Sequence, residues 1–74
     1  MTRENAIMEL LEKDKEFKHY YEKHEELDKL VSKLEKHHPM THELELEIEK
    51  LKKEKLYYKD LMEERIQRYM KKGS

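Results

Sequence analysis

Three histidines surround the only proline of the chain, and they are His37, His38 and His42. Imidazole nitrogens bind zinc, nickel and copper, and two helix ends that meet at a turn can bring three such side chains together. Histidine is also common where a helix ends, because the helix dipole favours positive charge there. The chain has no cysteine to complete a zinc site. We therefore interpret this stretch as a corner between two helices and keep a metal-binding hairpin that uses the three histidines as an alternative hypothesis.

A histidine and an aspartate also stand one helical turn apart, at His24 and Asp28. A histidine oriented by a carboxylate can act as a general base, but we find no nucleophile or oxyanion donor to work with it. We therefore predict a protein that is not an enzyme, with no catalytic residue and no cofactor. We instead predict a structural role for these residues. His24, Asp28, Lys52 and Lys55 would form a polar layer that fixes the register of two paired helices.

Basic side chains gather in the second half of the chain, in the stretch KLKKEK at residues 50–55 and again near the C-terminal end. Such clusters can contact phosphate groups of nucleic acid. The whole chain has 17 basic and 18 acidic residues, a formal net charge of -1, and the two kinds alternate along it. This balance favours a solvated helix face, so weak nucleic-acid binding is a second alternative that we consider unfavoured.

Size and composition limit the architecture to a single domain over residues 1–74. Hydrophobic residues make up 35% and charged residues 47% of the chain, with one glycine and one proline, which is typical of long solvated helices. The longest apolar runs are two or three residues, so we expect no membrane contact and no signal peptide, and a cytoplasmic location. A core this small barely balances the loss of chain entropy, and stability should need a further contribution.

Hydrophobic residues recur at alternating steps of four and three, which is the heptad pattern of a coiled coil. The pattern predicts one helix over about residues 3–37, a turn at 38–41 that contains Pro39, and a second helix over about 42–71. The stretch ELELEIE at 43–49 alternates with period two, but its residues are good helix formers and we assign it to the second helix. The predicted seam consists of Leu10, Phe17, Tyr20, Leu27, Val31, Leu34, Leu44, Ile48, Leu51, Tyr58, Met62 and Tyr69.

Folding the chain at the corner brings together residues whose numbers add up to about 78 or 79. The apolar positions of the two seams then face one another. The polar breaks also coincide, with His24 opposite Lys55 and Lys13 opposite Arg65. Because a shifted register would place these polar residues against apolar ones, the fold we predict is all-α, with two long helices in an antiparallel coiled-coil hairpin.

A second apolar set lies mostly off the seam and toward the end of the hairpin that holds the two termini. Apolar residues left uncovered on a helix pair are typical of interfaces. We therefore predict self-association as a homo-oligomer, or docking of a helical protein partner, at a surface formed by Ile7, Leu11, Tyr21, Leu56, Tyr57, Leu61 and Ile66.

Two stretches, HEELDKLVSKLE at residues 24–35 and EIEKLKKEKLYYKD at 47–60, carry a resemblance to a known family. They resemble the YdcH-like family of small bacterial proteins of unknown function, over about half of the chain. The chain departs from the family pattern at Tyr58, where leucine is usual, and at Leu61, where an acidic residue is usual. The resemblance implies a bacterial helical hairpin and transfers no catalytic residue. The function that we expect is that of a small protein–protein interaction or scaffold module.

Overall fold

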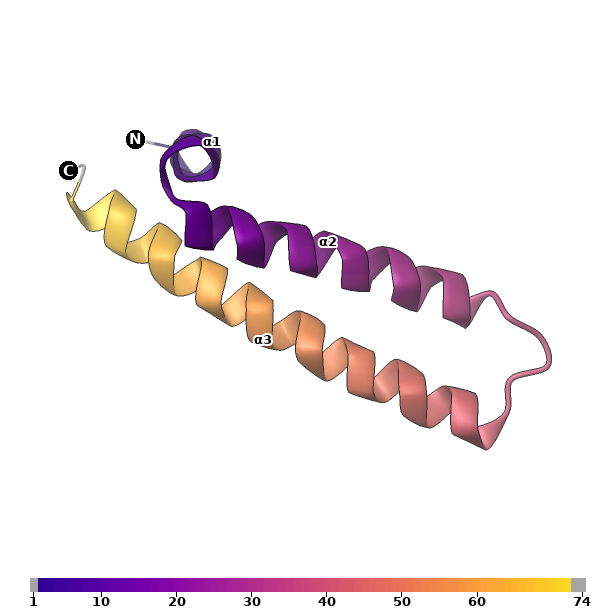
Figure 1. Cartoon of the computed structure of the whole chain (residues 1–74). Coiled ribbons are helices and arrows are strands. Elements are labelled where there is room, and N and C mark those ends of the chain that lie inside the picture. Colours follow the sequence, from indigo (N-terminus) through magenta and orange to yellow (C-terminus); the bar gives the residue numbers. More distant parts are fainter. Residues whose placement is uncertain (1, 73–74) are drawn as a thin grey trace.

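The computed structural model describes residues 2–72, which form three helices and no strand: α1 (Arg3–Lys13), α2 (Lys15–Glu35) and α3 (His42–Lys72). The prediction of an all-helical chain is therefore confirmed. α2 and α3 run side by side in opposite directions, and α1 is seen end-on where the two termini lie (Figure 1). The whole molecule is a rod of 50 × 19 × 16 Å. We call the end that carries α1 the open end, and residues 36–41 at the other end the corner.

The prediction of one unbroken helix over residues 3–37 is wrong, because the chain leaves the helical path at Asp14. Asp14 has extended backbone angles, φ -111° and ψ 105°, and its carboxylate accepts hydrogen bonds from the amides of Glu16 and Phe17 at 3.0 and 3.1 Å. This is an N-cap, in which a short acidic side chain satisfies amides that have no partner inside the helix. The cap begins α2 and lets α1 turn across α2 and α3.

The corner joins α2 to α3 through a second cap, at Thr41. Its hydroxyl accepts a hydrogen bond from the amide of Leu44 at 3.1 Å, and Glu43 and Glu45 lie in the first turn, where the helix dipole favours negative charge. The stretch with period-two alternation, residues 43–49, lies inside α3. The local helix propensity of Glu and Leu therefore decides its conformation.

Two hydrophobic clusters divide the length of the rod. The open-end cluster consists of Leu10, Phe17, Met62 and Ile66, and it receives residues from all three helices. Phe17 is 1% exposed, and Ala6 on α1 is also fully buried. The corner cluster consists of Val31, Ile48 and Leu51 from α2 and α3, with Leu27, Leu34 and Leu44 partly buried against it.

Ile66 was expected at an interface, and the structure places it in the open-end cluster with 3% exposure. The neighbouring residue Arg65, which the seam predicts at this place, is half-buried and pairs with Asp14 and Glu16. The sequence predicts Lys13 opposite Arg65, and the residue that binds Arg65 is the next one, Asp14. The helix break at Asp14 brings carboxylates to the guanidinium and leaves Lys13 exposed.

Candidate functional site

The corner histidines do not come together. His37, His38 and His42 are all exposed, and within residues 2–72 no group of three histidine or acidic side chains is arranged to hold a metal ion. A shallow hollow at the corner is lined by His37 alone among the three, with Pro39 and Glu43 among its other residues. The corner therefore serves as a turn and carries no preassembled metal site in the part of the chain that the structure describes.

The predicted polar layer is distributed along the rod. Lys55 donates a hydrogen bond to Asp28 at 3.1 Å, and Lys52 lies 3.8 Å from the carboxylate of Glu35. His24 is half-buried, and in the described range no hydrogen bond joins it to Asp28. The arrangement tethers α2 to α3 through charge pairs and does not orient His24 as a base.

Both arginines of α3 are paired with carboxylates. Arg65 bonds to Asp14 at 2.6 Å and also to Glu16, while Arg68 bonds to Glu64 at 2.6 Å within the same helix. The guanidinium carbon of Arg65 also lies 5.7 Å from the ring centroid of Tyr20. A cation that is paired with a carboxylate attracts phosphate less strongly, because the negative charge beside it offsets the attraction.

An ion pair and a hydrogen bond tie α1 to α3 at the open end. Arg3 binds Glu63 through both terminal nitrogens of its guanidinium, and the phenol of Tyr69 donates a hydrogen bond to Glu9 at 2.5 Å. Hydrogen bonding from Arg3 lowers the pKa of the Glu63 carboxyl below its usual value. Hydrogen bonding to Glu9 raises the pKa of the Tyr69 phenol, because the carboxylate disfavours a second negative charge beside it.

Asp14 links the helix break to α3. Desolvation alone would raise the pKa of its carboxyl, but the hydrogen bonds from the Phe17 amide and the Arg65 guanidinium outweigh it, and the pKa lies below its usual value. The same pair raises the pKa of Arg65. One carboxylate therefore caps α2 and holds α3 at the point where α1 departs.

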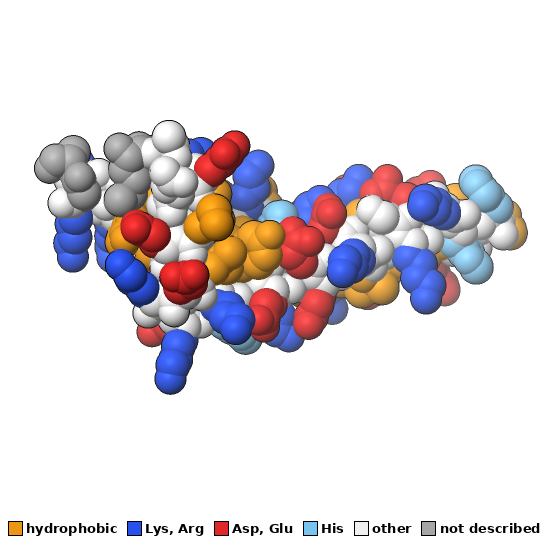
Figure 2. Space-filling model, turned by 90° about the horizontal axis from the view of Figure 1, so that it is seen from above, with side chains coloured by type: hydrophobic (Ala, Val, Ile, Leu, Met, Phe, Trp, Pro, Cys, Tyr) orange, Lys and Arg blue, Asp and Glu red, His pale blue; other side chains and the backbone are white. Residues whose placement is uncertain are grey.

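Large apolar side chains remain exposed on the rod. On α3, Leu56 is 55% and Tyr57 is 61% exposed, and on α2 Tyr21 is 37% exposed. Of the other residues predicted for an interface, Ile7, Leu11 and Leu61 are half-buried. Hydrophobic side chains gather on one face beside α1, while charged side chains alternate along the rest of that face (Figure 2). The remaining exposed apolar residues are scattered, and they are Met8, Leu30, Met40 and Leu46.

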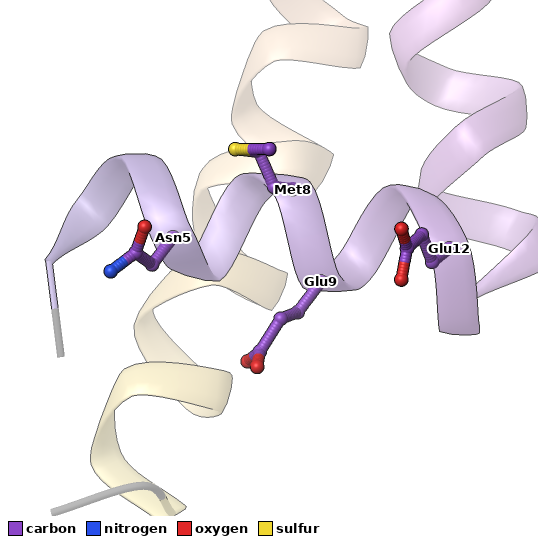
Figure 3. Close-up of a pocket in the computed structure, with 4 residues that line it drawn as sticks. All are labelled: Asn5, Met8, Glu9 and Glu12. Carbon is purple, nitrogen blue, oxygen red and sulfur yellow. The ribbon is translucent and has the colours of Figure 1, made fainter.

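A hollow on α1 is a poor candidate for a ligand-binding site. Asn5, Met8, Glu9 and Glu12 line it, and all four project from this one helix (Figure 3). No second element faces them to enclose a ligand. A useful site needs walls from more than one helix, which this hollow does not have.

A cleft of about 170 Å³ at the open end does have walls from all three helices. Its floor is apolar and consists of Ile7, Phe17, Met62 and Ile66. Its rim is polar, with two cations, two carboxylates, a tyrosine and a histidine. The rim residues are Arg3, Tyr21, His24, Glu25, Lys59 and Glu63. Sequence periodicity does not predict this cleft, since it depends on α1 crossing the hairpin.

Comparison with known proteins gives one family. A family model described as a protein of unknown function (DUF465) matches residues 17–70, and the resemblance to YdcH-like proteins is consistent with it. No curated protein and no solved structure matches the chain. The matched range includes most of α2 and α3 and leaves α1 outside. None of the helices over residues 2–72 is long and apolar enough to span a membrane.

Proposed function

The chain belongs to the DUF465 family, whose description names no activity, and we propose that it is a non-catalytic helical interaction module that associates with a second copy of itself. In this proposal α2 and α3 are an antiparallel coiled-coil hairpin that serves as the scaffold, and its open-end half carries the interface. The observation on which it rests is the exposure of Leu56 and Tyr57 at consecutive positions of α3, at 55% and 61%.

Exposed apolar side chains favour association because contact with a partner removes their surface from water. Each large apolar side chain that becomes fully buried contributes about 1.5 to 3 kcal/mol. Tyr57 also packs edge-on against Tyr58, with ring centroids 5.4 Å apart, which holds one aromatic ring at the surface. Rigid aromatic and aliphatic anchors of this kind are common at the centre of protein interfaces.

A second copy is a suitable partner on electrostatic grounds. The chain has a formal net charge of -1, and acidic and basic residues alternate along all three helices. A surface with strong charge of one sign would repel its own copy, whereas a balanced surface does not. The near-neutral charge therefore supports self-association over binding to a strongly charged partner such as nucleic acid.

The small core also supports association. Fully buried hydrophobic residues are few, and Phe17 is the one large side chain in the described range with less than 2% exposure. A domain of this size gains from oligomerisation, because binding to the folded state alone shifts the folding equilibrium toward it. Stability should then rise with protein concentration.

A non-catalytic role is supported by the cleft itself. Four apolar residues form its floor, and no serine, threonine or cysteine lies among the residues that line it. The rim cation Arg3 and the rim carboxylate Glu63 are bound to each other. Such a cleft suits an apolar side chain better than a reacting group.

Sedimentation of the whole chain over a range of micromolar concentrations tests the proposal. We expect a reversible dimer that dissociates in the double variant Leu56→Glu/Tyr57→Glu. Met40→Glu is the matched control, because Met40 is also exposed, at 37%, but lies at the corner. A wild-type chain that stays monomeric up to several hundred micromolar would overturn the proposal, as would equal dissociation by the control.

A further inference from the structure

Resting on the proposed self-association, we propose that the Leu56 side chain of each copy fills the open-end cleft of the other copy. Three features carry this inference: the place of Leu56 on α3, the size and lining of the cleft, and the charges on its rim.

Leu56 lies on the same face of α3 as the cleft. Lys59 and Glu63 line the cleft and follow Leu56 by three and seven residues, and residues at these spacings lie one above the other on a helix. Leu56 is 55% exposed. It is therefore an apolar knob next to an apolar hole, on one continuous surface of the rod.

The cleft has the size and chemistry to accept this side chain. Apolar cavities of about 150 Å³ accept a ligand as large as benzene, and a leucine side chain is smaller than that ring. The cleft measures about 170 Å³, and its floor includes Phe17, Met62 and Ile66. A leucine that enters would replace water at an apolar floor, which is favourable on both sides of the contact.

The neighbouring positions of knob and hole favour a two-fold dimer. In a two-fold interface the same patch meets itself, so residue i of one copy contacts residue j of the other and the reverse contact also forms. With the two-fold axis passing between Leu56 and the cleft, one rotation places the Leu56 side chain of each copy in the cleft of the other copy. The contact closes after two copies and leaves neither cleft empty.

The rim charges suit this self-complementary contact. Arg3 and Glu63 neutralise each other within one chain, which leaves Lys59 and Glu25 as the remaining charged residues of the rim. The two carry opposite signs. Across a two-fold axis, Lys59 of one copy can face Glu25 of the other, and this pair forms twice. A rim of one sign would instead repel its copy.

The absence of cysteine makes a direct test possible. Equimolar Leu56→Cys and Glu25→Cys proteins are mixed under mild oxidation, and the disulfide products are separated without reductant. We expect the mixed disulfide in large excess over either homodisulfide. The control replaces Leu56→Cys by Tyr57→Cys, one position along α3. Equal amounts of mixed disulfide from both mixtures would overturn the inference.

Sedimentation of single variants separates this inference from the proposed function. Leu56→Glu should raise the dissociation constant by about 30-fold or more, as expected for a central anchor. Tyr57→Glu should raise it by a clearly smaller factor, because Tyr57 flanks the contact and does not enter the cleft. A dimer that resists Leu56→Glu but dissociates in Tyr57→Glu would overturn the knob-in-cleft contact and leave self-association standing. A monomeric wild-type chain would overturn both.

Discussion

The open end and the corner of this rod share the same two helices, but the open end has a third helix and a larger hydrophobic cluster. At the open end, α1 covers the hairpin, and Phe17 is 1% exposed. At the corner, α2 and α3 have only each other, and Leu27 and Leu34 remain half-buried beside Val31. Two helices bury a single seam, whereas a third helix can close over a side chain from the remaining side.

The charged contacts between helices also differ between the open end and the corner. Arg3, Tyr69 and Arg65 bind carboxylates across helices at the open end. At the corner half, the cross-helix pairs are Lys52 with Glu35 and Lys55 with Asp28. Since surface pairs are worth little singly, the network matters mainly by fixing where α1 lies. The open end should therefore be the more cooperative half of the molecule.

The largest expected effect comes from Phe17→Ala, which we predict to lower the free energy of unfolding by about 3 to 5 kcal/mol through loss of burial and a cavity. Leu34→Ala at the corner should cost about 1 to 2 kcal/mol, because Leu34 is only partly removed from water. Urea unfolding followed by circular dichroism measures both. If Phe17→Ala does not fold, Phe17→Leu gives a milder comparison. Equal losses at the two positions would contradict the difference in burial between Phe17 and Leu34.

The second effect compares the N-caps of α2 and α3. Asp14→Ala should cost about 2 kcal/mol, since it removes both the cap of α2 and the pair with Arg65. Thr41→Ala removes only the cap of α3 and should cost about 1 kcal/mol. Hydrogen exchange by NMR should also show faster exchange of the α1 amides in Asp14→Ala. Unchanged α1 exchange would show that Asp14 does not hold α1 in place.

A third test uses pH. The pKa of Asp14 and that of Glu63 are lowered in the folded state, so both carboxyls contribute stability above their unfolded pKa of about 4, and this contribution is lost as the pH falls through the folded pKa. We expect the free energy of unfolding to decrease when the pH is lowered below about 4. The double variant Asp14→Asn/Glu63→Gln should show a smaller fall. An identical acid profile in the variant would contradict the assignment.

The smallest effect belongs to the corner histidines. Replacing His37, His38 and His42 together by glutamine should change the free energy of unfolding by no more than about 0.5 kcal/mol, because all three are exposed. Zinc should also leave the urea midpoint of the wild-type chain unchanged. Stabilisation by zinc that is lost in the triple variant would contradict this expectation and would revive the metal site.

The all-helical nature of the chain is determined by the sequence alone. Apolar residues at steps of four and three, helix-forming Glu and Leu, and a proline between two such runs allow this class of fold and disfavour strands. The buried positions Phe17, Val31, Ile48 and Met62 all stand on the seam that periodicity marks. These features are local, so they can be inferred without knowing how the helices pack.

The break at Asp14, the burial of Ile66 and the cleft depend on tertiary structure. The heptad pattern continues through Asp14, so periodicity favours one helix, although an aspartate followed by Glu16 is a possible capping signal. The helix ends there because Asp14 reaches both the α2 amides and Arg65, a residue 51 positions away. That contact exists only once α3 has folded back beside α2. Packing between distant segments therefore places α1, and with it a cleft that all three helices line.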